Sequence, residues 1–235
     1  MEYETLKNGT RVYIDETIRF GFDALILSHF ALSKQKQRIL DLGCGCGILS
    51  LSALDRGHGN RFVMIDINEQ AVFLANKGAN EYRAEHPASL PIEVSRQDLK
   101  SFSYPSKFDV VICNPPYFSV HSGHLSRDIL NMAARHELRC TIDDVAFAAH
   151  RNLKQGGSLC ISYRPARLAD AIIAMRNHRL EPKRMRFVRN DATQNPWLVL
   201  IEAHLDGGIG LDVVPDLIVQ DDAGGFSAEM LSIVG

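Results

Sequence analysis

The sequence predicts an α/β protein built on a doubly wound, mostly parallel sheet of seven strands, a Rossmann-like arrangement. Short apolar, β-branched runs such as 38–42, 61–65 and 108–113 alternate with segments of helical length. A glycine-rich loop, residues 43–47, follows the first of these runs directly. Polar residues end the runs, and the carboxyl ends of parallel strands meet at one edge of a sheet. These observations predict a ligand site at that edge.

Length and composition are those of one globular unit. The chain has 235 residues, 46% of them hydrophobic, and a formal net charge of −2. We expect an N-terminal extension over residues 1–35 and a single domain over residues 36–235. The amino terminus lacks a basic region followed by an apolar one, and no apolar run has the length of a membrane span. We therefore expect a cytoplasmic protein with no membrane contact. The sequence leaves the oligomeric state open, with a monomer favoured.

The N-terminal extension is expected to contain a short β-ribbon and a helix. Asn8-Gly9 lies between two stretches of alternating polar and apolar residues, which is a hairpin pattern. Asp23 precedes the apolar run 24–31 and is interpreted as the N-cap of a helix. This helix would lead into the sheet.

The core elements follow in βα order. We expect strands at 38–42, 61–65, 91–95, 108–113 and 158–163, and helices at 48–54, 68–82, 141–153 and 167–177. Thr141 is expected to cap its helix, and Gly156-Gly157 to break it. The segments 183–188 and 197–204 would close the sheet as a hairpin with an antiparallel member, and the tail could add edge strands.

The polar residues at the strand ends indicate the ligand. Asp66 ends the second strand, where a carboxylate can accept the hydroxyls of a ribose. A dinucleotide fingerprint is incomplete, because Ser50 stands where the third glycine of G-x-G-x-x-G belongs after Gly45 and Gly47. Asp41 suits an ammonium better than a pyrophosphate. S-adenosylmethionine carries an ammonium, a ribose and an adenine, so it fits this set better than a dinucleotide.

The stretch Asn114-Pro115-Pro116-Tyr117 follows the strand expected at 108–113. Because Pro115 has no N–H to donate to a sheet ladder, the strand must end before it. An Asn side chain offers an acceptor, a Pro-Pro backbone leaves its carbonyls available, and a Tyr ring offers a stacking face. These residue types suit a planar group that carries an NH2. An ordinary proline turn is the alternative for this stretch taken alone.

Two motifs together carry a family resemblance. The segment 41–47, Asp-Leu-Gly-Cys-Gly-Cys-Gly, resembles the first motif of class I S-adenosylmethionine-dependent methyltransferases, and residues 114–117 resemble the fourth motif of those that methylate exocyclic or amide nitrogens. Most of the chain, including Arg135-His136-Glu137, further resembles the tRNA1(Val) (adenine(37)-N6)-methyltransferase family.

The resemblance implies a role for each site residue. Asp41, Gly43 and Gly45 would hold the methionine part of S-adenosylmethionine, Asp66 its ribose and Asp98 its adenine amino group. Asn114 and the Pro115 carbonyl would accept the two N6 hydrogens of the target adenine, and Tyr117 would stack on the base. Methyl transfer would then depend on orientation and electrostatics rather than on a strong general base.

Charge along the chain is segregated. Residues 151–190 carry ten basic and two acidic side chains, whereas 191–235 carry eight carboxylates and no Lys or Arg. The two segments either pair with each other or leave a basic patch for a polyanion. On the second interpretation, tRNA would be contacted by Lys183, Arg184, Arg186 and Arg189.

Five cysteines without CxxC spacing predict neither a disulfide framework nor a zinc site, and we expect no metal.

Other functions share some of these features. Methylation of a protein glutamine amide uses a similar grip, but such enzymes carry a longer helical N-terminal domain. Guanine N2 methyltransferases more often show Phe after the prolines. A non-catalytic RNA-binding subunit would have no need of Asp41, Asp66 and residues 114–117. Methylation of an adenine N6 in tRNA is the function that we expect.

Overall fold

We analysed a computed structural model of the chain, which describes residues 1–32, 37–87, 91–115 and 140–234. The predicted N-terminal ribbon is confirmed, because β1 (Glu2–Thr5) and β2 (Arg11–Ile14) pair antiparallel. Gly9 has φ +104° in the connecting turn, a conformation that glycine adopts without a Cβ penalty. The ribbon leads to helix α1 (Phe22–Ala31).

Four parallel strands form the half of the main sheet that carries the predicted site. They are β3 (Arg38–Leu42), β4 (Arg61–Asp66), β5 (Ile92–Arg96) and β6 (Phe108–Cys113), with β3 between β6 and β4. Asp41 pairs in register with Met64 on one side and Ile112 on the other. The carboxyl ends of these strands therefore lie at one edge, as predicted.

The other half of the sheet holds the predicted hairpin. β7 (Leu153–Tyr163) lies parallel to β6, and β9 (Leu198–Leu205) runs antiparallel between β7 and β8 (Leu180–Arg189). Two short strands from the C-terminal tail, β10 (Asp212–Val213) and β11 (Leu217–Ile218), pair parallel with β8. Within the described residues the main sheet has nine strands: the seven that the sequence predicts and the two short edge strands from the tail.

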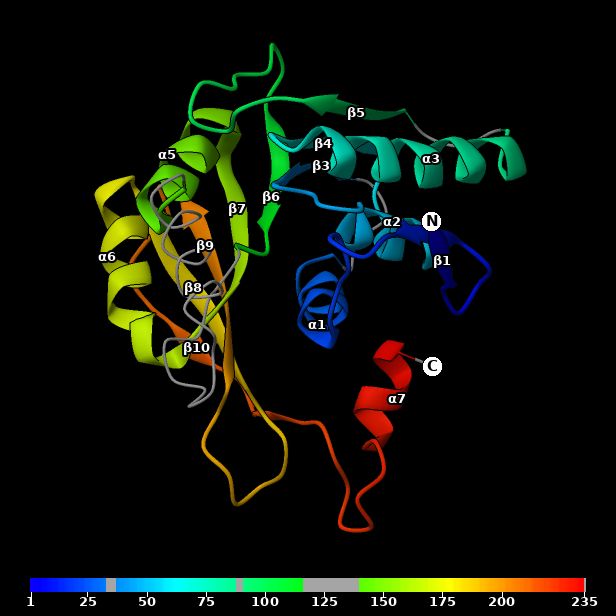
Figure 1. Ribbon diagram of the computed structural model, residues 1–235. Helices are drawn as coiled ribbons and strands as arrows, with labels where there is room; N and C mark the ends of the chain where they lie inside the picture. The colour runs from blue at the N-terminus through cyan, green and yellow to red at the C-terminus, as the bar shows by residue number, and fades with distance from the viewer. Residues whose placement is uncertain (33–36, 88–90, 116–139, 235) are drawn as a thin grey trace, which may run out of the picture.

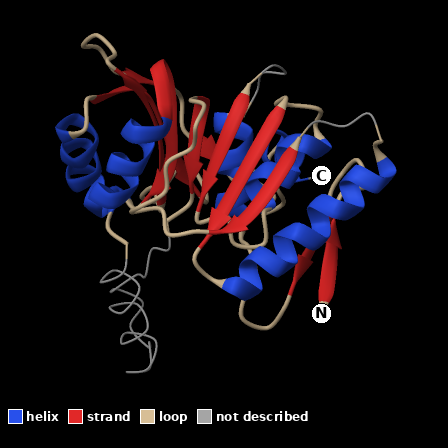
Figure 2. Ribbon diagram, turned by 90° about the horizontal axis from the view of Figure 1, so that it is seen from above, coloured by secondary structure: helices blue, strands red, loops and turns tan. Residues whose placement is uncertain are grey.

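Helices cover both faces of the sheet (Figure 1, Figure 2). One face carries α1, α2 (Ile48–Asp55) and α3 (Glu69–Glu85), and its buried side chains form one core cluster. The opposite face carries α5 (Ile142–Asn152) and α6 (Leu168–Asn177), preceded by the 3₁₀ turn η1 (Pro165–Arg167), over a second cluster. This is the doubly wound arrangement that the sequence predicts.

The C-terminal tail returns to the N-terminal helix. Helix α7 (Ala228–Val234) lies beside α1 in Figure 1, and buried Met230 belongs to the same core cluster as Leu27 of α1. The rings of Phe22 and Phe226 meet edge to face at 5.3 Å. The N-terminal helix thus shares a core with the domain. The proposed boundary at residues 35 and 36 falls outside the described residues.

Two local predictions were wrong. Gly21, not Asp23, is the N-cap of α1, because the helix already begins at Phe22 and places Asp23 in its first turn. Gly156 and Gly157 lie inside β7 rather than before it. The strand already begins at Leu153, the residue that follows the last residue of α5. The predicted cap of α5 is confirmed, with a reciprocal capping box between Thr141 and Asp144.

Candidate functional site

The glycine loop and Asp66 form one hydrogen-bonded unit. The backbone N–H of Gly45 donates to Asp66 Oδ2 at 2.9 Å, and the N–H of Asn68 donates to Asp66 Oδ1 at 2.8 Å. The N–H of Cys44 donates to the Ile65 carbonyl at 3.0 Å. The loop after β3 therefore lies against the end of β4. Each oxygen of the Asp66 carboxylate is oriented by one backbone hydrogen bond.

The loop is shaped by three glycines with left-handed backbone. Gly43, Gly45 and Gly47 have φ values of +68°, +55° and +83°. A Cβ atom built on Gly43 or Gly45 would meet no atom within 4 Å, whereas one on Gly47 would lie 3.3 Å from Ala75 Cβ and Met64 Sδ. A side chain at Gly47 would therefore crowd its neighbours at the start of α2. Gly43 and Gly45 border open space, which fits a loop that a ligand approaches closely.

Asp41 is fully buried beneath this loop. Its Oδ2 accepts a hydrogen bond from Ser50 Oγ at 2.7 Å, and its Oδ1 has no hydrogen-bond partner among the described residues. Burial raises the pKa of the Asp41 carboxyl to about 7, with the nearby charge of Asp66 acting in the same direction and the Ser50 bond opposing both. A buried acceptor without a donor fits a cationic ligand group, such as the ammonium of S-adenosylmethionine.

The end of β5 joins the same edge. The N–H of Gln97 donates to the Asp66 carbonyl at 2.9 Å, and Arg96 Nε donates to the Ile67 carbonyl at 3.1 Å. Asp98 is exposed, and its Oδ1 accepts from the Lys100 N–H at 2.9 Å. The structure therefore brings the Asp98 segment to the end of β4, as the sequence predicts.

Ile67 was not singled out from the sequence. Its side chain is 57% exposed, directly after Asp66 and beside the Asp98 segment. Exposed apolar side chains also occur elsewhere in this chain, for example at Ile173 and Ile209, but Ile67 lies between two carboxylate positions, where it suits the flat face of a purine. The signal in the sequence is that an apolar residue, Ile67, directly follows Asp66, the polar residue at which the strand ends.

Asn114 lies at the carboxyl end of β6, next to buried Pro115. Its Nδ2 donates to Asp23 Oδ2 of α1 at 2.9 Å, and its Oδ1 accepts a hydrogen bond from Ser162 Oγ of β7. The side-chain amide is thus held between two neighbouring elements. Neither contact was predicted: Asp23 was interpreted as a helix cap, and Ser162 as a strand residue.

Several predicted residues lie outside the described part of the chain. These are Pro116, Tyr117, Arg135, His136 and Glu137. Their predicted roles stay predictions. Within the described ranges, no group of three or more His, Cys, Asp or Glu side chains is placed to hold a metal ion. The same residues contain no helix with both the length and the apolar character required to cross a membrane.

The predicted basic cluster is engaged in contacts within the chain. Arg186 forms two hydrogen bonds to Glu229, at 2.6 and 2.8 Å, and holds the pKa of that carboxyl below its usual value. Arg189 pairs with Asp216, and Arg184 with Glu202 at 2.8 Å. Lys183 Nζ donates to the Gly208 carbonyl at 2.9 Å. These contacts are of the kind expected if the basic and acidic segments pair with each other.

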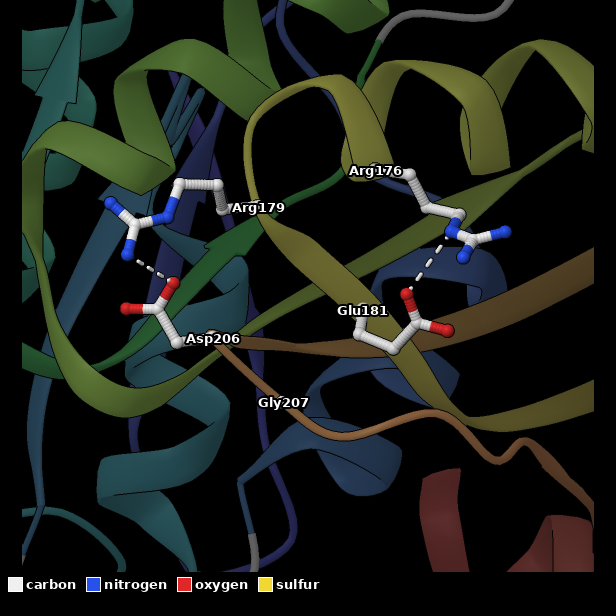
Figure 3. Close-up of a pocket in the computed structure, with 5 residues that line it drawn as sticks. All are labelled: Arg176, Arg179, Glu181, Asp206 and Gly207. Atoms are coloured by element: carbon white, nitrogen blue, oxygen red, sulfur yellow. Dashed lines mark ion pairs between the residues drawn. The ribbon is translucent and has the colours of Figure 1, made fainter.

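Two further ion pairs line a surface pocket far from the glycine loop, around a cavity of about 370 Å³ (Figure 3). Arg179 pairs with Asp206 of the acidic segment at 2.7 Å, and Arg176 pairs with Glu181 inside the basic segment at 3.1 Å. The pocket lies where α6 leads into β8 and where β9 ends. β9 runs antiparallel to β7, so this is the amino edge of the parallel strands, opposite to Asp41, Asp66 and Asn114. The pocket is thus separate from the predicted site.

Solved structures show the same fold. A predicted O-methyltransferase from Agrobacterium tumefaciens is 18% identical, with a TM-score of 0.69, and the match covers 90% of this chain and 94% of that one. A putative class I S-adenosylmethionine-dependent methyltransferase from Listeria monocytogenes, also 18% identical, gives a TM-score of 0.61 with 94% and 72% covered. The doubly wound sheet with its antiparallel β9 is therefore a methyltransferase fold.

Sequence relatives carry one recurrent name. A tRNA1(Val) (adenine(37)-N6)-methyltransferase of Vibrio cholerae is 34% identical over 116 residues, which cover 49% of this chain and 46% of the relative. One of Phocaeicola vulgatus is 27% identical over 234 residues, covering 98% and 95%. The chain thus spans about half the length of the Vibrio relative and nearly all of the Phocaeicola relative.

A family model gives the broadest assignment. The model of the methyltransferase small domain matches residues 5–176. That range contains the glycine loop, Asp66, Asp98 and Asn114, and it extends over more than half of the chain. The chain belongs to the methyltransferase small domain family.

Proposed function

We propose that this protein transfers a methyl group from S-adenosylmethionine to the N6 amino group of an adenine in tRNA, with adenine 37 of tRNA1(Val) as the first candidate. The observation that carries the proposal is the position of Asn114, whose amide is fixed by Asp23 and Ser162 at the sheet edge that also holds Asp41 and Asp66. The names of the sequence relatives support the choice of substrate.

The cofactor would lie across the carboxyl ends of β3, β4 and β5. Asp41 would attract its ammonium, the backbone at Gly43 and Gly45 would allow close approach, and Asp66 would accept from the ribose hydroxyls. Asp98 would take the adenine amino group. When bound, S-adenosylmethionine supplies an electrophilic methyl on a sulfonium, whose sulfur keeps the electron pair of the broken bond.

The residues of this chain would act on the acceptor nitrogen. Asn114 Oδ1 and the Pro115 carbonyl would accept the N6 hydrogens, which turns the N6 lone pair out of conjugation with the ring. Tyr117 would stack on the base. As the new carbon–nitrogen bond forms, N6 becomes cationic and its proton becomes acidic enough to pass to water. Orientation therefore supplies the rate enhancement, without a strong base.

The unpaired bases of an anticodon loop are already partly unstacked, so presenting one to the site costs little. RNA contact by Lys183, Arg184, Arg186 and Arg189 stays part of the proposal. Because these side chains have partners within the chain, RNA phosphates would have to compete with those partners. Such competition predicts modest affinity and strong salt dependence.

The test is transfer of labelled methyl from S-adenosylmethionine to unmodified tRNA, with release factor protein as a parallel substrate, followed by nucleoside mass analysis. N6-methyladenosine in the tRNA is the expected result. Label in the protein alone would assign a glutamine amide as the acceptor, and N2-methylguanosine would assign a guanine. Transfer to none of these substrates would overturn the proposed activity.

A further inference from the structure

Asn114 is held on both sides by residues outside its own motif. Asp23 comes from the first turn of α1, 91 residues earlier, and accepts from Asn114 Nδ2 at 2.9 Å. Ser162 comes from β7, 48 residues later, is fully buried, and donates to Asn114 Oδ1. Strands β6 and β7 are neighbours, and their pairing continues to Cys113 and Ile161, the residues directly before Asn114 and Ser162.

The chemistry of the two partners fixes which end of the amide faces which way. An ionised carboxylate only accepts hydrogen bonds, so the NH2 group of Asn114 must face Asp23. The Ser162 hydroxyl donates to the carbonyl end. A carbonyl oxygen can accept two hydrogen bonds, so this contact is compatible with a second donor such as an amino group. A flipped amide would present its NH2 to the substrate NH2, and two donors cannot bond to each other.

The charge of Asp23 adds to this geometric effect. A hydrogen bond to a carboxylate is stronger than one between neutral groups, and it polarises the amide so that electron density increases at Oδ1. The acceptor nitrogen gains positive charge during methyl transfer. A polarised Oδ1 would stabilise that charge more than it stabilises the neutral amine, so the contribution would appear in kcat.

Gly21 provides an independent observation. It has φ −115°, which any residue adopts, so its backbone does not require glycine. A Cβ atom at this position would nevertheless lie 2.6 Å from Asp23 Oδ1. Because Gly21 has no side chain, the Asp23 carboxylate can occupy the space beside it. A methyl group at Gly21 would displace the carboxylate from this position.

We propose that Asp23 and Ser162 are positioning residues that hold the Asn114 amide in the orientation that accepts the substrate amino group. The inference rests on the proposed function for the identity of that amino group. The hydrogen-bonded arrangement itself can be tested without substrate.

The kinetic test compares Asp23→Ala with Asp143→Ala. Asp143 is the matched control, because it is the second residue of α5 as Asp23 is of α1, and it bonds to His178 rather than to the site. We expect Asp23→Ala to lower kcat about 10- to 100-fold, the range for a misplaced catalytic contact, with the KM for S-adenosylmethionine unchanged. Asp23→Asn, which keeps an acceptor but loses the charge, should recover part of the loss.

Ser162→Ala and Gly21→Ala should lower kcat in the same way, since each releases one side of the amide. Equal kcat values for the Asp23 and Asp143 variants would overturn the inference. If Asp23→Ala does not fold, Asp23→Asn takes its place in the same comparison, and a kcat equal to that of wild type would then overturn the role of the charge.

The substrate-free test is the ¹⁵N NMR signal of the Asn114 side-chain NH2, identified by its loss in Asn114→Ala. We expect both of its proton shifts to move in Asp23→Ala and in Ser162→Ala but not in Asp143→Ala. Unchanged shifts in the first two variants would overturn the arrangement. If wild type methylates no substrate, the proposed function fails, and this measurement alone decides whether the amide is held.

Discussion

The carboxylate of Asp66 accepts a hydrogen bond from the backbone N–H of Gly45, which joins the loop after β3 to the end of β4. Gly45 has a left-handed backbone with φ +55°, and its Cβ position faces open space. The carboxylate proposed to bind the ribose and the loop proposed to approach the cofactor are thereby placed in one unit. Substitutions in the loop should separate ligand binding from stability.

Gly45→Ala and Gly47→Ala form a matched pair for that separation. Both would carry the cost of a left-handed alanine, about 1 kcal/mol. Gly45→Ala should reduce S-adenosylmethionine affinity at least tenfold, since the new methyl enters the space through which the ligand approaches. Gly47→Ala should lower the free energy of unfolding further, because its methyl meets Ala75 and Met64 at 3.3 Å. Calorimetric binding and urea unfolding measure the two effects. Equal affinities would remove Gly45 from the ligand site.

Asn114→Ala should reduce methyl transfer by on the order of 100-fold or more, as expected when a contact made in the transition state is lost. Affinity for S-adenosylmethionine should stay within about twofold, because the proposed cofactor contacts lie on β3, β4 and β5. Turnover with labelled cofactor and equilibrium binding measure these quantities. Full activity in this variant would rule out the grip on the amino group.

Asp41 should make stability depend on pH. Its folded pKa is raised from 3.8 to about 7, so the folded protein binds more protons than the unfolded chain between these values. The stability linked to this group is thus complete below about pH 4 and is lost as pH rises to about 7, by a few kcal/mol at most. Asp41→Asn should remove this dependence. Urea unfolding at pH 5, 6, 7 and 8 would show it, and parallel slopes for both proteins would contradict it.

The same titration should affect the cofactor. An ammonium near Asp41 would favour the ionised carboxylate, so S-adenosylmethionine affinity in wild type should rise with pH through about 7. Asp41→Asn should bind more weakly, with affinity independent of pH over that range. Binding measured at pH 6 and pH 8 distinguishes the two. A variant that binds as tightly as wild type would show that Asp41 has no ligand role.

Lys183→Ala and Arg184→Ala should weaken RNA binding and reduce its salt slope by about one charge each. Arg184 also lies over the Phe30 ring at 3.9 Å and donates to the Phe30 carbonyl, so its loss should lower stability as well. Exposed Lys7, in the N-terminal hairpin, is the control. Reduced stability with unchanged RNA affinity would assign Arg184 to structure, and unchanged RNA affinity in both variants would remove the cluster from the RNA site.

The sequence was sufficient for the order of elements. The strand at 108–113 was predicted at its observed bounds, and the Thr141 cap and the Asn8-Gly9 turn are both present. Each of these depends on residues within a few positions of one another. Side-chain periodicity, capping and left-handed turns are local properties, which a short window of sequence contains.

The predicted convergence of Asp41, Asp66, Asp98 and Asn114 also needed no tertiary structure. In a parallel sheet with right-handed crossovers, every strand ends at the same edge. The polar residue after each strand is therefore placed there by topology alone. The sequence determined the fold, the edge of the sheet at which these residues meet and the position of Asn114 on it.

The partners of these residues were decided only by tertiary structure. Asp23 lies 91 residues from Asn114, and in sequence it has the pattern of a helix cap. Arg186 bonds to Glu229, which lies 43 residues later in the chain. The charge pattern of the sequence allowed either this pairing or a basic surface for RNA. Such contacts depend on how helices and the C-terminal tail pack on the sheet, and each involves residues whose local sequence fits another role equally well. Local sequence can specify an element but not which distant side chain will lie against it.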